Sequence, residues 1–201
     1  MSLFIKSEYG ILKIIYENHG IRLTSLMQKA RVSAATLKIR VGKLLERGII
    51  KEEKIFGKKK VILKNLYPNF ESEYGKQSFS LIELEKRHEF LKKNKNLAIP
   101  FKQLANNVKG IKVILVFGSF ANYSETRDSD LDILILGDKL LNKEMLKKEI
   151  ERSFATFNHE ISPRIDTYNN FRKNKTNEIY QTIIQNHVVI YGALNFIEMV
   201  K

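Results

Sequence analysis

Two acidic residues stand one residue apart where an apolar run begins. In the stretch VFGSFANYSETRDSDLDILIL, residues 116–136, Asp130 and Asp132 flank Leu131. Because residues i and i+2 of a strand point to the same face, their carboxylates would project side by side, with about 6–7 Å between the Cα atoms. Two carboxylates held together repel each other unless a cation lies between them. Mg²⁺ accepts carboxylate and phosphate oxygens together, so the pair predicts a metal site for phosphate chemistry.

The apolar run before these acids ends in a glycine and a serine. Residues 111–117, IKVILVF, predict a buried strand, and Gly118-Ser119 follows it directly. A glycine at this point lets the backbone approach a ligand closely. The residues from Ser119 to Tyr123 can begin a helix, whose N-terminus favours an anion. One segment is therefore expected to hold phosphates beside the segment that holds metal, whereas an isolated pair of acids would more simply mark a solvated strand entry.

With both segments in place, the stretch GSFANYSETRDSDLDILIL resembles the signature of the polymerase-beta-like nucleotidyltransferase superfamily, and of its minimal branch in particular. Six residues fall at the spacing of that signature: Gly118, Ser119, Ala121, Ser129, Asp130 and Asp132. The resemblance covers about residues 98–192. It implies an enzyme that transfers a nucleoside monophosphate from a nucleoside triphosphate to a hydroxyl acceptor, with two Mg²⁺ ions as cofactors.

The same resemblance assigns roles to individual side chains. Gly118, Ser119 and Ser129 would bind the nucleotide. Asp130 and Asp132 would be the catalytic residues that hold the metal ions. Catalysis would then consist of positioning and electrostatic stabilisation.

Two features depart from the family pattern. The family often has Arg-Gly where this chain has Asn122-Tyr123. Loss of the arginine removes a phosphate contact, and loss of the glycine alters the loop. Tyr123 would either stack on a base or pack in the loop. The family's third carboxylate lies on a neighbouring strand, and Asp166 is expected to be this third catalytic, metal-binding residue. Arg164 could occupy the place instead, and Glu160 shares the same strand face. Without a third acid, metal binding would weaken and activity could be lost.

Apolar periodicity predicts the elements that must position these residues. After a polar linker at residues 68–80, helices are expected at 81–95 and after Pro100. The later elements are expected to be a strand at 131–136, a helix at 141–156, an edge strand at 160–167 that contains Pro163, a helix at 176–186 and a short strand VVIY. The expected fold class is α+β or α/β, with a small mixed sheet flanked by helices in a nucleotidyltransferase domain at 98–201.

The first third of the chain has a different pattern. Its expected elements are helices at residues 7–18, 25–30 and 34–47, and a hairpin around Phe56-Gly57. Thr24 and Ser33 are the expected N-caps, and Gly48 is expected to stop the third helix. This order resembles the winged helix-turn-helix family over about residues 5–66. A domain at 1–67 would therefore precede a linker and connecting helix at 68–97.

The resemblance and the charge of this segment both predict a nucleic-acid partner. In the family, the second helix of the motif enters the major groove. Carried over to this chain, the DNA-binding residues would be Ser33, Thr36, Lys38, Arg40 and Lys43 on that helix, and Lys58, Lys59 and Lys60 at the wing tip. Of the net charge of +13, residues 1–67 contribute +10, with 15 Lys and Arg against 5 Asp and Glu. Such an excess predicts double-stranded DNA, although surface lysines that only solubilise, or a dimerisation module, are alternatives.

Composition limits the class of protein. The chain has no cysteine, which excludes disulfides and thiolate metal sites. Its longest apolar stretches, of about five to seven residues, are short of the roughly 20 that a membrane helix needs, and the N-terminus lacks the apolar run of a signal peptide. We therefore expect a soluble, cytoplasmic protein without a membrane partner.

Three functions stay open on the sequence alone. The first is a nucleotidyltransferase coupled to a DNA-binding winged helix. The second is a DNA-binding transcriptional regulator whose other domain only senses nucleotide or is inactive. The third is an antitoxin-like protein that nucleotidylates a partner protein. A homodimer is also left open, since winged-helix proteins often pair to read two half-sites.

Overall fold

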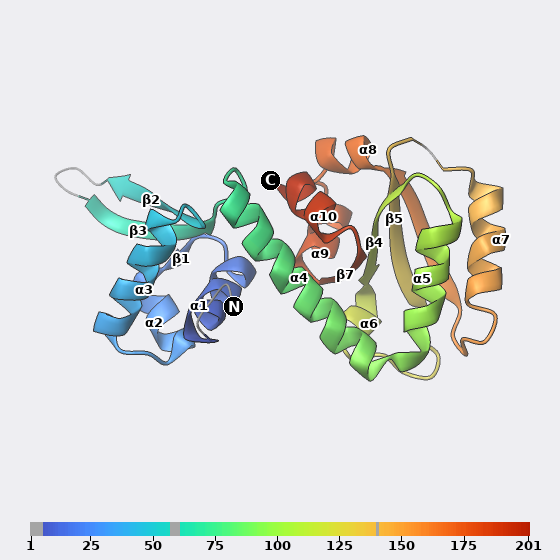
Figure 1. Cartoon of the computed structure of the whole chain (residues 1–201), viewed down its shortest axis with the longest axis horizontal. Helices are drawn as coiled ribbons and strands as arrows, with labels where there is room; N and C mark the ends of the chain where they lie inside the picture. The colour runs from blue at the N-terminus through green and yellow to red at the C-terminus, as the bar shows by residue number, and fades with distance from the viewer. Residues whose placement is uncertain (1–5, 57–60, 140) are drawn as a thin grey trace. The chain divides into compact units, whose positions relative to one another are not determined.

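The structure divides into two units, Met1–Phe79 and Ser80–Lys201. It is a computed structural model, and it describes residues 6–56, 61–139 and 141–201 (Figure 1). Within these ranges, no helix is both long and apolar enough to cross a membrane.

The N-terminal unit consists of three helices and an antiparallel sheet. Its elements in chain order are α1 (Lys6–Glu17), β1 (Ile21–Arg22), α2 (Leu23–Ala30), α3 (Ala34–Glu46), β2 (Ile50–Phe56) and β3 (Val61–Pro68). The strands pair antiparallel in the order β1-β3-β2. The helices and the sheet together bury Ile11, Leu12, Ile15, Leu26, Leu37, Leu44, Ile49 and Leu66. The expected winged helix-turn-helix fold is therefore confirmed.

Local signals set both ends of α3. The Ser33 hydroxyl accepts a hydrogen bond from the backbone N–H of Thr36 at 3.2 Å and caps the helix, as predicted. Gly48 has a φ of +64°, a left-handed conformation that suits glycine, and it follows the last turn. The amide of Ile49 then donates to the carbonyl of Leu44 at 2.9 Å, which satisfies a carbonyl that the helix itself leaves free.

The expected N-cap at Thr24 is wrong. Helix α2 already begins at Leu23, and its N-cap position, Arg22, makes no side-chain capping bond. The reason is that Arg22 pairs with β3 as part of the short strand β1, so the chain passes directly from strand into helix.

Helix α4 (Glu73–Lys93) begins inside the segment predicted as a polar linker, residues 68–80. The buried ring of Phe79 is stacked on Tyr16, with 5.2 Å between ring centroids, and meets Phe70 edge-on at 5.4 Å. Packing of this ring stabilises a helix that the polar composition of the segment does not predict. The linker is therefore shorter than expected.

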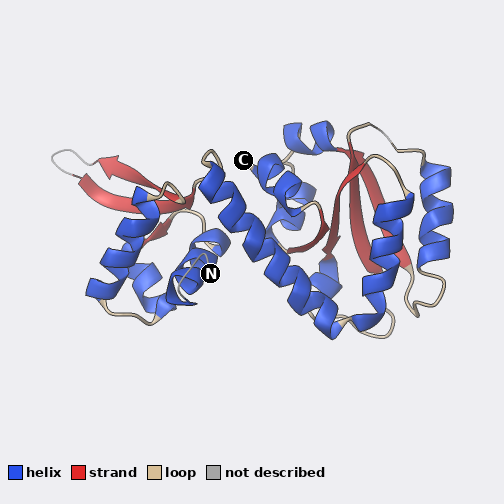
Figure 2. Cartoon of the chain, in the orientation of Figure 1, coloured by secondary structure: helices blue, strands red, loops and turns tan. Residues whose placement is uncertain are grey.

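The C-terminal unit contains a four-stranded mixed sheet with helices on both faces (Figure 2). Its elements after α4 are η1 (Lys95–Leu97), α5 (Ala98–Asn107), β4 (Ile111–Phe117), α6 (Gly118–Ala121), β5 (Leu131–Gly137), α7 (Lys143–Ser153), β6 (Ile161–Thr167), α8 (Tyr168–Lys173), α9 (Glu178–Gln185), β7 (His187–Tyr191) and α10 (Ala193–Val200). The strand order is β6-β5-β4-β7, with β5 and β6 parallel and the other neighbours antiparallel. Strand β6 lies at the edge, as its proline at position 163 predicts.

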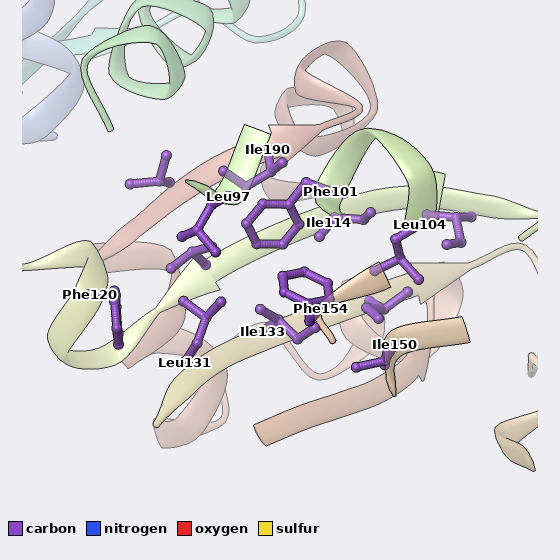
Figure 3. Packing of buried hydrophobic residues seen from close by; sticks show 14 of the residues in the cluster. Leu97, Phe101, Leu104, Ile114, Phe120, Leu131, Ile133, Ile150, Phe154 and Ile190 are labelled. Carbon is purple, nitrogen blue, oxygen red and sulfur yellow. The ribbon is translucent and has the colours of Figure 1, made fainter. Parts of the chain in front are cut away.

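Alternation along the strands divides their apolar residues between the two faces of the sheet. Ile114 and Ile133 face α5 and α7 and pack with Phe101 and Phe154 in one buried cluster (Figure 3). The opposite face is covered by α8, α9 and α10, which bury Phe171, Tyr180, Ile183, Phe196, Ile197 and Met199. Burial on both faces explains why the strands β4 and β5 are nearly continuous apolar runs.

Replacing Gly75 by alanine should destabilise the N-terminal unit by about 1–3 kcal/mol, although Gly75 lies in a helix. A Cβ at this position would overlap the carbonyl oxygen of Asn69 and lie 3.2 Å from that of Ile49. Gly10→Ala is the matched control, because Gly10 is exposed in α1 and a Cβ there would meet no atom within 4 Å. This substitution should stabilise the protein by up to about 1 kcal/mol, since alanine has the higher helix propensity. Denaturant unfolding measures both changes, and equal effects of the two substitutions would contradict the predicted overlap.

Candidate active site and nucleic-acid surface

The predicted phosphate segment and the acidic pair meet at one end of the sheet. Strands β4 and β5 are antiparallel, and Val116 pairs with Ile133. The residues that follow β4 therefore lie beside the residues that begin β5. Helix α6 starts at this point, and Asp132, the second residue of β5, points to the opposite face from Ile133.

Gly118 is held directly against the Asp132 carboxylate. Its φ is +70°, and a Cβ added to it would overlap Oδ2 of Asp132 and lie 3.3 Å from its Cγ. Glycine suits this position, because its backbone is left-handed and because any Cβ would push the Asp132 carboxylate aside. Ser119 follows half-buried, and its carbonyl accepts a hydrogen bond from the amide of Ser124 at 3.0 Å, which folds the next residues back over the turn.

The acidic pair carries an uncompensated charge. Asp130 is exposed and Asp132 is half-buried. Burial and the neighbouring charge of Asp130 raise the pKa of the Asp132 carboxyl, and a hydrogen bond with Ser162 offsets part of this rise. Among the residues that the structure describes, no lysine or arginine forms an ion pair with either acid. Oxygen ligands with unbalanced negative charge fit Mg²⁺.

Ser129 and His159 fix the turn that leads into the acids. The Ser129 hydroxyl accepts a hydrogen bond from the amide of Thr126 at 2.9 Å, so it closes the turn. His159 donates through Nδ1 to the carbonyl of Ser129 at 2.9 Å, and its ring meets Phe120 edge-on at 5.2 Å. His159 was not predicted as a site residue, since no metal-ligand spacing among the histidines marks it. Only the pairing of β6 beside β5 reveals its place.

Two family models match separate parts of the chain. Residues 101–193 match the family model for polymerase beta nucleotidyltransferases, and residues 6–51 match that for winged helix-turn-helix DNA-binding domains. The fusion predicted from the sequence is confirmed. The nucleotidyltransferase match begins in α5 and includes the turn at Gly118 and both acids.

Similarity beyond these family models is weak. The solved "Crystal structure of the toxin-antitoxin with AMP-PNP" is similar over 49% of this chain and 77% of that chain, with 16% identity and a TM-score of 0.39. A likeness at this level carries no argument about function. No curated protein matches the chain significantly.

In the nucleotidyltransferase unit, the structure does not bring Asp166 to the acidic pair. The parallel register of β5 and β6 pairs Asp132 with Ser162 and places Asp166 opposite Leu136, four residues further along. The Asp166 carboxylate instead accepts hydrogen bonds from the hydroxyl of Tyr180 and from the side-chain amide of Asn170 at 2.8 Å. The expected role of Asp166 as a third metal ligand does not fit this placement, because its carboxylate lies four residues further along the sheet and is hydrogen-bonded there. Alternation in the sequence predicts the face on which a strand residue lies, and it leaves open a shift of the register by two or four residues.

The Asp166 contacts give this part of the sheet a structural role. Burial, followed by the hydrogen bond to Asp166 and its negative charge, raises the pKa of Tyr180 to about 12. The ring of Tyr180 also packs on Phe171, with 4.5 Å between centroids. The three residues therefore join β6, α8 and α9 on this face.

Other residues of β6 lie nearer the acids. Ser162 is paired with Asp132, and the carbonyl of Glu160 accepts a hydrogen bond from the amide of Leu131 at 2.8 Å. Alternation puts Glu160 on the same face as Ser162. Arg164 is exposed on that face and forms no ion pair with the acids in the part of the chain that the structure describes. Within the same ranges, no three acidic or histidine side chains are grouped closely enough to hold a metal ion.

Tyr123 is partly exposed, and the contacts of its ring are with α4. It has a φ of +55°, an unusual left-handed backbone for a tyrosine, at the place where the family often has glycine. Lys93 lies over its ring, with Nζ 3.7 Å from the centroid, and Phe90 is 6.5 Å away. Burial, Glu89 and Glu125 raise its pKa. With α4 on its ring, the tyrosine anchors the loop in a conformation that glycine adopts without strain.

In the winged-helix unit, the predicted DNA-binding residues fall into two groups. Ser33, Lys38 and Lys43 are exposed on α3. Thr36 and Arg40 are half-buried, and Nη1 of Arg40 is buried with no hydrogen-bond partner in the described residues. The expectation that Arg40 lies on the exposed face is therefore wrong, because position 40 turns toward the core with its neighbours at 37 and 44.

The predicted wing-tip residues Lys58, Lys59 and Lys60 lie outside the described residues. Their contribution to DNA binding stays a prediction from the sequence.

Replacing Asp132 by asparagine should raise the melting temperature of the metal-free protein at pH 7. The folded-state pKa of Asp132 is raised, so its ionised form destabilises the fold as the pH rises through that pKa. The gain should shrink toward about pH 4 and vanish below it, since the carboxyl then becomes protonated in the unfolded chain as well. Thermal unfolding in chelator at both pH values measures the change. Asp138→Asn is the control and should bring no such gain, since the exposed Asp138 is paired with Lys112 at 3.1 Å. An Asp132→Asn variant that is no more stable than the wild type at pH 7 would contradict the prediction.

Proposed function

We propose that the nucleotidyltransferase unit transfers a nucleoside monophosphate from a nucleoside triphosphate to a hydroxyl acceptor, and that the winged-helix unit binds duplex DNA. The single observation that carries the transferase is the contact between Gly118 and Asp132. It joins the turn suited to phosphates with the acids suited to metal, in the order of the matched family.

The acids are the residues that would hold the cofactor. Asp130 and Asp132 offer carboxylate oxygens on one face at the sheet end, and burial and mutual repulsion disfavour their shared charge. This donor set fits Mg²⁺, of which two ions are expected from the family resemblance. When bound, Mg²⁺ would neutralise phosphate charge and favour deprotonation of the acceptor hydroxyl.

The transfer itself forms a bond between the acceptor oxygen and the α-phosphorus and breaks the bond from that phosphorus to the pyrophosphate oxygen, while the hydroxyl loses its proton. Gly118 and Ser119 would position the phosphates, since the backbone at Gly118 is open to a close approach. Ser129 would act indirectly, because its hydroxyl closes the turn before the acids. Positioning of this kind can supply much of the rate acceleration in phosphoryl transfer.

Glu160 is the residue that we propose as the third carboxylate in place of Asp166. It directly precedes β6 and shares the strand face of Ser162, the partner of Asp132. Its side chain would have to turn toward the pair, which its exposure permits. Glu160→Gln should therefore weaken Mg²⁺-dependent nucleotide binding, whereas Asp166→Asn should act on the stability of the fold.

The transferase predicts saturable binding of ATP in the presence of Mg²⁺. The double substitution Asp130→Asn with Asp132→Asn should weaken this binding by at least the roughly 10–100-fold that loss of even a supporting residue costs at a metal site. Isothermal titration with ATP and Mg²⁺ measures the affinity, and release of pyrophosphate measures turnover.

Two variants sharpen this test. Gly118→Ala should act like the double substitution, since the added methyl group would displace the Asp132 carboxylate. Asp138→Asn, at the other end of β5, should leave binding unchanged. Unchanged affinity and turnover in the double variant would exclude a metal role for the acids, and normal nucleotide binding without turnover would favour the regulator that only senses nucleotide.

DNA binding is supported by the charge of +10 on residues 1–67 and by the winged-helix match. Lys38→Gln with Lys43→Gln should weaken binding to all duplexes alike and lower the slope of log affinity against log salt by about 1 per lysine. Fluorescence anisotropy over a salt series measures this slope. Lys102→Gln with Lys109→Gln, two exposed lysines near α5, is the control. A protein that binds no duplex at low salt would end the DNA-binding proposal without affecting the transferase.

A further inference from the structure

We propose that α3 reads DNA through methyl contacts and that Ile39 selects a thymine in the major groove. The proposal rests on the proposed binding of duplex DNA by the winged-helix unit. It adds the class of base that the unit prefers and the residue that makes the choice.

The outward face of α3 is poor in groups that read bases by hydrogen bonds. Its exposed residues are Ala34, Ala35, Lys38, Ile39, Gly42, Lys43 and Glu46. Asparagine, glutamine and arginine are absent from these exposed positions. The groups on this face that can form hydrogen bonds with base edges are Lys38, Lys43 and Glu46, and we assign the two lysines to phosphates. Arg40 is half-buried, and the hydroxyl of Ser33 is engaged in the N-cap.

Ile39 is the large apolar side chain on this face. It is 62% exposed, whereas Leu37, Val41 and Leu44 on the other side of the helix are at most 5% exposed. The core of the unit therefore does not need Ile39. A single exposed isoleucine is common on protein surfaces. Ile39 differs in that it lies on the helix that winged helix-turn-helix proteins place in the major groove.

The neighbours of Ile39 suit a close approach to a groove. Ala35 lies one turn before it and Gly42 one turn after, so the helix backbone on this side is nearly bare. Lys38 and Lys43 flank the same surface and carry the positive charge that attracts phosphates. Small residues between two lysines allow the helix to sit deep enough for Ile39 to touch base edges.

Thymine is the base that such a side chain recognises. In the major groove, thymine alone presents a C5-methyl group, which makes apolar contacts. An isoleucine there gains free energy by burying that methyl group, and it needs no hydrogen-bonding group to do so. The preferred duplex should therefore contain thymine at the position that faces Ile39.

Deoxyuridine substitution isolates this contact, because deoxyuridine lacks the C5-methyl group and keeps the hydrogen-bonding pattern of thymine. The full chain is first used to select its preferred duplex from random sequence, and each thymine is then replaced singly. One replacement should weaken binding about fourfold, the effect expected for loss of one buried methyl group. Ile39→Ala should weaken binding to the original duplex by at least as much and should make the protein insensitive to that same replacement.

Ile99→Ala is the matched control, since Ile99 is 67% exposed in the other unit and should change neither affinity nor sensitivity to deoxyuridine. A duplex bound specifically but indifferent to every deoxyuridine replacement would overturn the methyl readout, as would an Ile39→Ala variant that keeps the wild-type sensitivity. Salt-dependent binding without any sequence preference would overturn it while leaving DNA binding intact. Absence of binding at low salt would overturn both proposals.

Discussion

The close approach of one backbone turn to one carboxylate governs the candidate active site. The antiparallel pairing of β4 with β5 carries the turn at Gly118 to the side of Asp132, where a Cβ would overlap the carboxylate as it lies. The turn at Gly118 and the acids are thus held together by main-chain hydrogen bonds of a buried sheet. A geometry fixed in this way does not depend on the rotamers of long side chains, which favours the precise positioning that transfer chemistry needs.

The same geometry places two negative charges close together, which destabilises the folded state. Two carboxylates begin one strand, and burial adds to their repulsion at Asp132, while a hydrogen bond with Ser162 offsets only part of it. The His159 contact to the carbonyl of Ser129 helps to hold the backbone before the acids in place. A divalent cation at the proposed site would relieve this repulsion, so metal binding would also stabilise the fold of this unit.

Local signals in the sequence predicted most of the elements, and long-range pairing explains the errors. The cap at Ser33, the stop at Gly48 and the Gly118 turn each depend on nearby residues, and each lies where its local pattern indicates. The position of Asp166 depends on the register between two parallel strands, which no local pattern specifies. The inward turn of Arg40 was missed for a related reason, because a polar residue beside the apolar stripe of a helix can point either way.

Helix α4 affects how the protein can be divided. Phe79 packs with aromatic residues of the N-terminal unit, whereas Phe90 belongs to the buried cluster of the C-terminal unit, and both lie on one continuous helix of 21 residues. A fragment that ends at residue 79 would leave its last core ring on a fraying helix end, and a fragment that starts at residue 80 would lose the turns that nucleate its first helix. Either half produced alone therefore needs turns of α4 from beyond this boundary, so the minimal fragments overlap in sequence.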